Sequence, residues 1–150
     1  MKSLSPMRRL GAALAAMLGT VVALDAGAST GPLPRERVSG VASYLSGGVS
    51  LAQSQAFEQA FRDYPLVVKL YEHEGARDVY TADALVRIVD AHGHTVVDAK
   101  ADGPFMLVRL PHGDYTVTAS LGMHSLPAHH VHVTDHGHAN ATFVFPAHSG

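Results

Sequence analysis

Short runs of alternating apolar and polar residues dominate the second half of the chain, most clearly between Val86 and Val117. Val86 and Ile88, and later Phe105 and Leu107, recur with a period of two. This period buries one face of a strand and exposes the other. The breaks DAHG, ADG and PHGD supply the Gly and Asp residues of tight turns between antiparallel strands. The pattern therefore predicts a small, mainly β sandwich.

Seven strands are predicted in this part of the chain. They are expected at residues 66–72, 84–90, 95–100, 104–110, 114–121, 128–133 and 139–145. This number and spacing suit a seven-stranded antiparallel Greek-key sandwich. Residues 72–83 between the first two strands are polar and are expected to form a loop, and the short apolar run at residues 41–45 is a candidate for a further strand.

One amphipathic helix is predicted ahead of these strands, at about residues 50–63. Ser50 is placed to cap it, and Gln53 three residues later completes a capping-box pattern. Residues at positions i, i+3, i+4 and i+7 form a single apolar stripe, made by Phe57, Ala60, Phe61 and Tyr64. Pro65 ends the helix, because the residue before a proline is disfavoured in helical conformation. We expect this helix to lie on the sandwich.

The first 28 residues have the features of a signal peptide. A basic segment at residues 2–9 precedes an apolar run at residues 10–24, and the sequence AGA at residues 26–28 is a small-x-small cleavage site. The apolar run of about fifteen residues is too short to span a bilayer comfortably. We therefore expect a periplasmic or secreted mature chain that begins at Ser29 and contains no transmembrane segment.

The mature chain is expected to hold one domain. Residues 29–40 carry Pro, Gly and charge without a period and are predicted to be a flexible leader, followed by a single domain at residues 41–150. The chain contains no Cys, which excludes disulfides and thiolate chemistry. Removing three basic residues and Asp25 with the signal peptide, from 11 Lys and Arg and 13 Asp and Glu, leaves a net charge of −4 with His neutral. This charge argues against nucleic acid or an anionic membrane surface as the partner.

The segment from about residue 80 to residue 145 resembles a known family, the carboxypeptidase regulatory-like domains. Their pattern is an apolar-x-apolar strand ending in Asp, a Gly turn, then G-x-F-x-L and L-x-x-G-x-Y-x-V. The matching residues here are Val86, Ile88, Asp90, Gly93, Gly103, Phe105, Leu107, Leu110, Gly113, Tyr115 and Val117. The resemblance implies a transthyretin-like (prealbumin-like) sandwich with Tyr115 in its core. It also implies a non-catalytic accessory role of the kind found on secreted peptidases and outer-membrane receptors.

Histidine supplies the strongest candidate chemistry. The chain has 11 His residues, several of them in the segment LPAHHVHVTDHGHANATF. On a strand, His130 and His132 point to the same face about 7 Å apart, a distance that two ligands of one metal ion can span. His136 and His138 are expected in a hairpin turn from which they fold back as further ligands. Neutral imidazole suits Cu(II), Zn(II) and Ni(II), and Asp135 is a candidate oxygen ligand or ring-orienting group.

Three functions stay open on the sequence alone. The favoured one is a non-enzymatic accessory or binding protein that contacts an envelope protein or peptide. The second is a periplasmic metal binder that uses the His-rich segment, although these histidines match no established metal motif and are explained better as ordinary surface residues. The third is a hydrolase-type enzyme with its site in the loop at residues 72–83, where Glu72, His73, Glu74, Asp78 and Asp83 gather.

Overall fold

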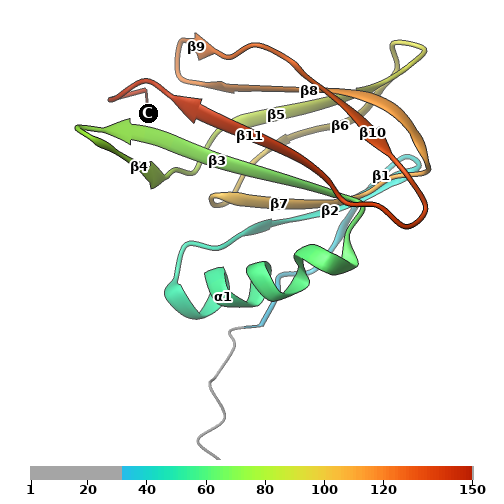
Figure 1. Ribbon diagram of the computed structural model, residues 1–150, viewed down its shortest axis with the longest axis horizontal. Helices are drawn as coiled ribbons and strands as arrows, with labels where there is room; N and C mark the ends of the chain where they lie inside the picture. The colour runs from blue at the N-terminus through green and yellow to red at the C-terminus, as the bar shows by residue number, and fades with distance from the viewer. Residues whose placement is uncertain (1–31, 150) are drawn as a thin grey trace, which may run out of the picture.

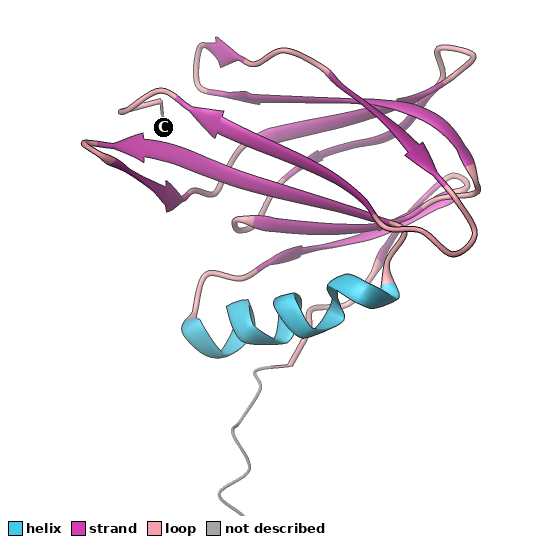
Figure 2. Ribbon diagram, viewed as in Figure 1, coloured by secondary structure: helices cyan, strands magenta, loops and turns pink. Residues whose placement is uncertain are grey.

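The protein is built mainly of β-strands, arranged in two sheets with one helix (Figures 1 and 2). The computed structural model describes residues 32–149, so the predicted signal peptide lies outside the described residues. The elements are β1 Arg37–Ser39, β2 Ala42–Gly47, α1 Leu51–Ala60, the 3₁₀ turn η1 Phe61–Asp63, β3 Leu66–Glu74, β4 Arg77–Tyr80, β5 Leu85–Asp90, β6 Thr95–Lys100, β7 Phe105–Arg109, β8 Gly113–Leu121, β9 His124–Ser125, β10 His129–Val133 and β11 Ala139–Phe145.

The strands divide into one mixed and one antiparallel sheet. The first sheet has six strands in the order β1-β2-β7-β3-β11, with β4 also paired to β3. The second has five strands in the order β10-β8-β5-β6, with β9 also paired to β8. Strands β3 and β11 are parallel, from the pair Leu66 and Ala139 to the pair Glu72 and Phe145. The prediction of a purely antiparallel fold is therefore wrong for this pair.

The parallel pair follows from the path of the chain after β10. Strand β10 pairs with β8 in the second sheet, whereas β11 pairs with β3 in the first. The connection at residues 134–138 therefore crosses from one sheet to the other and is not the hairpin turn that the sequence predicts. This crossing decides where His136 and His138 lie, as described below.

All seven predicted strand regions are strands, and the described residues add four more. Three additions are short or polar: β1, β4 and β9. The fourth, β2, coincides with the apolar run at residues 41–45. Strand β1 lies in the segment predicted to be a flexible leader, so the first sheet begins inside that segment. The predicted loop at residues 72–83 is largely a hairpin of β3 and β4, in which the rings of Tyr71 and Tyr80 stack with centroids 5.3 Å apart.

The two sheets enclose one hydrophobic core. Strand β8 shows the expected alternation, with Tyr115, Val117, Ala119 and Leu121 all buried. The Tyr115 hydroxyl still donates a hydrogen bond, of 2.9 Å, to the Pro111 carbonyl at the turn before the strand. A buried tyrosine with its hydroxyl satisfied in this way fixes the turn against the core.

The helix covers the outer face of the first sheet and forms a second core. Phe57, Ala60, Tyr64, Val67, Phe105 and Leu107 are buried together there. Strand β7 is consequently buried on both faces, with Phe105 and Leu107 toward α1 and the alternate residues, Met106 and Val108, in the core between the sheets. The expectation of one exposed face is therefore wrong for this strand, because a central strand covered by a helix and a second sheet has none.

Helix α1 begins as the sequence predicts. Ser50 is its N-cap and accepts a 3.2 Å hydrogen bond from the Gln53 backbone N–H. The Gln53 side chain reaches back to accept from the Gly48 N–H at 2.8 Å, two residues before the cap. The last predicted turn, residues 61–63, is a 3₁₀ turn and not α-helix. Neither helical segment within residues 32–149 is long and apolar enough to cross a membrane.

Three connections meet at one end of the sheets, the right-hand end in Figure 1. These are the β5–β6 turn, the β7–β8 turn and the β10–β11 connection. The pairings require this, because Asp90 at the end of β5 and His132 near the end of β10 both lie opposite the first residues of β8. Histidines from all three connections therefore gather at this end.

Candidate metal-binding site and end groove

Strand β10 presents two histidines on the outer face of the second sheet. Its residues alternate, with Val131 and Val133 buried and His130 and His132 exposed. Strand β10 is an edge of its sheet and pairs only with β8, which places His130 opposite Thr116 and His132 opposite Asp114. The predicted sharing of one face by His130 and His132 is confirmed.

In each of the two rings, Nδ1 contacts a residue on the neighbouring strand β8. The His132 Nδ1 lies 2.6 Å from Oδ1 of Asp114, and the His130 Nδ1 lies 3.1 Å from Oγ1 of Thr116. An ionised carboxylate only accepts hydrogen bonds, so in the neutral His132 ring the proton is on Nδ1 and the lone pair is on Nε2. A carboxylate behind a histidine is the arrangement that orients imidazole ligands at metal sites. Nε2 of His132 is therefore left for a ligand, and Nε2 is also the nitrogen of His130 that Thr116 does not contact.

The two rings border one shallow hollow of about 280 Å³. Its remaining lining comes from Ala91 and from residues of β8 and β10. The His132 side chain is 66% exposed, so an ion reaches it from solvent without any movement of the backbone. The site supplies two imidazoles and one carboxylate that holds a ring, which is the donor chemistry of Cu(II), Ni(II) and Zn(II).

His136 and His138 are not brought to this hollow. Both lie in the connection that leaves the second sheet for the first, and they line a separate groove. Asp135 faces the groove as well, where its Oδ1 is 3.3 Å from Nδ1 of His112. Within residues 32–149 no three His, Asp or Glu side chains are close enough to hold one ion together. The four predicted ligands therefore form one exposed pair and two separate groove residues.

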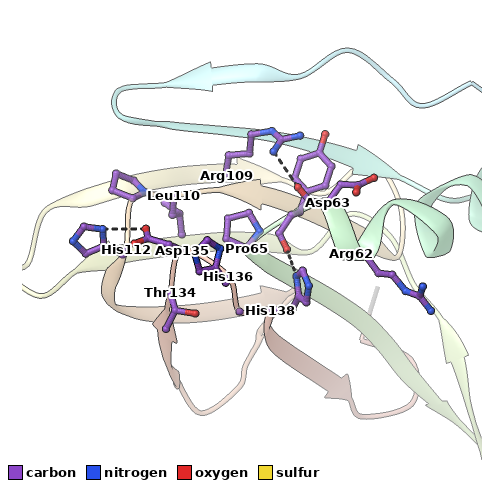
Figure 3. Close-up of a pocket in the computed structure, with 13 residues that line it drawn as sticks. Arg62, Asp63, Pro65, Arg109, Leu110, His112, Thr134, Asp135, His136 and His138 are labelled. Carbon is purple, nitrogen blue, oxygen red and sulfur yellow. Dashed lines mark hydrogen bonds and ion pairs between the residues drawn. The ribbon is translucent and has the colours of Figure 1, made fainter.

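The groove occupies the end of the sheets where the connections meet (Figure 3). It has a volume of about 540 Å³ and is lined by η1 and the two residues after it, by the end of β7 and the β7–β8 turn, and by the β10–β11 connection. Its charged lining residues are Arg62, Asp63, Arg109 and Asp135, two of each sign. His138 Nδ1 lies 3.2 Å from the Tyr64 carbonyl and donates to it, which ties the β10–β11 connection to the start of β3.

One wall of the groove rests on a network centred on Glu36. Its Oε1 accepts hydrogen bonds from the Tyr64 hydroxyl at 2.5 Å and from Arg109 Nε at 3.0 Å, and its Oε2 accepts one from Ser43 at 2.9 Å. The Tyr64 bond is the main cause that holds the pKa of Glu36 below its ordinary value. Arg109 also donates to the Asp63 carbonyl at 3.0 Å, so this network fixes one side of the groove.

The acidic cluster at residues 72–83 makes two separate structural contacts. His73 and Asp78 are paired across β3 and β4. Glu72 accepts a 2.7 Å hydrogen bond from the Ser149 backbone N–H, so its carboxylate fixes the C-terminal segment. A hollow of about 230 Å³ lies beside Glu72, Glu74 and His148. The hydrolase-type enzyme stays a prediction.

Sequence reasoning missed the groups that orient the site. Asp114 and Thr116 lie 18 and 14 residues from their histidine partners, and only the β8–β10 register joins them. The alternation of apolar and polar residues does predict that polar residues of paired antiparallel strands lie opposite one another. It does not predict which residues pair, because the turn residues alone do not fix the register.

We compared the chain with protein-family models, with curated protein sequences and with solved structures, and none of the three comparisons finds a match.

Proposed function

We propose that this chain is an exported, non-enzymatic binding protein whose ligand is a transition-metal ion held by His130 and His132. The observation that carries the proposal is the hydrogen bond that His132 Nδ1 donates to Asp114, with a second hydrogen bond between His130 Nδ1 and the Thr116 hydroxyl on the same face. Three other exposed histidines, His73, His94 and His112, also face an aspartate. What sets His130 and His132 apart is that two partnered rings stand two residues apart on one face of one strand. Cu(II) is the tightest-binding divalent candidate, followed by Ni(II) or Zn(II).

Calorimetric titration of the tag-free mature protein with Cu(II) and Zn(II) tests this function. Saturable binding should weaken at least tenfold in His130→Ala, because one of two ligands is lost. The chain offers a matched control, since His73 is also paired with an aspartate across two strands but has no histidine two residues away. His73→Ala should bind as the parent does. If no saturable heat of binding is observed, or if both variants lose the same affinity, His130 and His132 are ordinary surface residues.

Export is the second part of the proposal. The basic, apolar and AGA segments at residues 2–28 support cleavage before Ser29 and a periplasmic or secreted location. Intact mass spectrometry of the protein recovered from the envelope should give the mass of residues 29–150. A retained signal segment would contradict this assignment.

The fold proposed for the mature domain is a transthyretin-like Greek-key sandwich of the carboxypeptidase regulatory-like kind. Support comes from the motif residues at residues 86–117, which fall at strands β5 to β8, and from the single core between the two sheets. An experimental structure would test the connection order. Sheets joined in a different order would leave only the general likeness of two packed sheets.

A second candidate function is the docking of an envelope protein or peptide in the end groove. The groove gathers side chains of both charges from η1, the end of β7 and the β10–β11 connection, which suits an extended peptide with its own charged side chains. Arg62→Glu reverses one charge on the lining and should abolish retention of a partner cross-linked in the envelope. Arg77→Glu, on β4 outside the groove, should retain it. Equal retention by both variants would exclude the groove.

A further inference from the structure

The histidine pair leaves a metal ion with an incomplete coordination shell. A Zn²⁺ ion bound in a protein takes four ligands in most structural sites. His130 and His132 supply two, and residues 32–149 bring no third His, Asp or Glu side chain into range. Two positions on the ion therefore face solvent, open to another molecule.

The surroundings of the pair admit a large partner. Strand β10 is the outermost strand of its sheet, and the pair stands on the face turned away from the first sheet and α1. Beside the rings the outward-facing residues are Ala91, Asp114 and Thr116, all with short side chains. The two imidazoles therefore stand above these three neighbours, and a second protein surface can approach them.

Charge favours a second copy of this chain as that partner. Each copy brings one carboxylate, Asp114, directly behind its His132. One copy leaves a bound Zn²⁺ with a net charge of +1, whereas two copies bring two carboxylates and neutralise it. A bound ion whose charge is neutralised by nearby carboxylates is more stable at a protein surface than one whose charge is not. Two identical pairs related by a two-fold axis also supply four imidazole nitrogens, the number that tetrahedral coordination requires.

We infer that Zn²⁺ joins two copies of this protein through a four-imidazole site, with His130 and His132 contributed by each copy through Nε2. The inference rests on the metal-binding function proposed above and adds its partner and stoichiometry. The dimer forms by an isologous contact in which the outer faces of two second sheets meet at β10. Without zinc the four-imidazole site is absent, and we expect the chain to be a monomer.

Sedimentation velocity of the tag-free mature protein during a zinc titration tests the inference. The mass should double as zinc approaches one ion per two chains. It should fall again when zinc exceeds one ion per chain, because each pair then holds its own ion. A chelator should restore the monomer. His130→Ala and His132→Ala should each remain monomeric at all zinc concentrations, while the control His73→Ala should dimerise as the parent does.

The outcomes separate this inference from the function it rests on. Calorimetric zinc binding at one ion per chain with an unchanged monomer mass would overturn the bridged dimer and leave the metal site intact. Absence of zinc binding would overturn the inference, and absence of copper binding as well would overturn both. A dimer that survives the chelator or the His130→Ala change would show a contact independent of the metal and would also overturn the inference.

Discussion

A single carboxylate decides whether the exposed histidines form a site. Asp114 holds the proton of His132 on Nδ1 and leaves Nε2 as the ligand atom. Partners of this kind typically account for a 10–100-fold change in metal affinity. We expect Asp114→Asn to weaken Cu(II) and Zn(II) by about 10–100-fold, measured by competition with a chromophoric chelator. Asp78→Asn, which removes the matching partner of His73, should leave affinity unchanged, and equal effects of the two changes would contradict the assigned role.

Tyr115 combines a buried ring with one hydrogen bond, and two variants separate these contributions. Tyr115→Phe removes only the bond to the Pro111 carbonyl and should lower the free energy of unfolding by about 1 kcal/mol. Tyr115→Ala also leaves a cavity in the core between the sheets and should cost about 3–5 kcal/mol. Urea denaturation of both variants measures the difference. Equal losses would mean that the ring contributes little to the core.

Glu36 makes the stability of the protein depend on pH in the acid range. Its pKa is lowered in the folded state, mainly by the Tyr64 hydroxyl. The Glu36 carboxylate therefore stabilises the fold above the ordinary value of 4.5. This stabilisation is lost as the pH falls through the lower, folded pKa. The difference in urea midpoint between the parent and Glu36→Gln should be largest near neutral pH and should shrink in acid. A difference that is constant with pH would place the contribution elsewhere in the network.

At the scale of elements, strand β7 is the strand against which helix α1 packs. The Phe105 ring contacts Phe57, with centroids 5.9 Å apart, and Phe61, at 5.3 Å. Phe105→Ala should cost about 3–5 kcal/mol, and it should raise amide hydrogen exchange in α1 more than in β8. Exchange measured by mass spectrometry distinguishes the two elements. Uniform exchange across both would mean that α1 does not depend on this ring.

The elements with the strongest periodicity could be predicted, and those fixed by tertiary contacts could not. Strands β5 and β8 and helix α1 follow from the period of their apolar residues and from Ser50 at the cap. Strand β1 could not be predicted, because Arg37 to Ser39 have no apolar alternation and are held by pairing with β2. The two buried faces of β7 were also beyond a local pattern, since Phe105 is covered by a helix more than forty residues earlier in the chain.

Only part of the candidate site could be predicted from the sequence. Residue spacing alone placed His130 and His132 on one face, because strand alternation is a local property. The positions of His136 and His138 depend on β11 joining β3 in the other sheet, a long-range pairing that no local pattern reports. Asp114 entered the site for the same reason, through the register of β8 against β10.

At the scale of the whole molecule, the end groove and the outer face of the second sheet are two surfaces with different chemistry. The end groove collects residues from the connections, whereas the outer face of the second sheet carries the oriented histidine pair on a rigid strand. A site on a strand holds its ligands more accurately than one on a loop. This difference is why we assign the metal to the pair and a peptide or protein partner to the groove.

The most direct test of this account is nitrogen NMR of the imidazole rings in the ¹⁵N-histidine-labelled mature protein, followed during addition of Zn²⁺. We predict that the Nε2 signals of His130 and His132 shift together and saturate. The Nδ1 of His132 should keep its proton, and the rings at the opposite end of the sheets should be unchanged. Shifts spread evenly over the histidines, or confined to those of the end groove, would contradict the site.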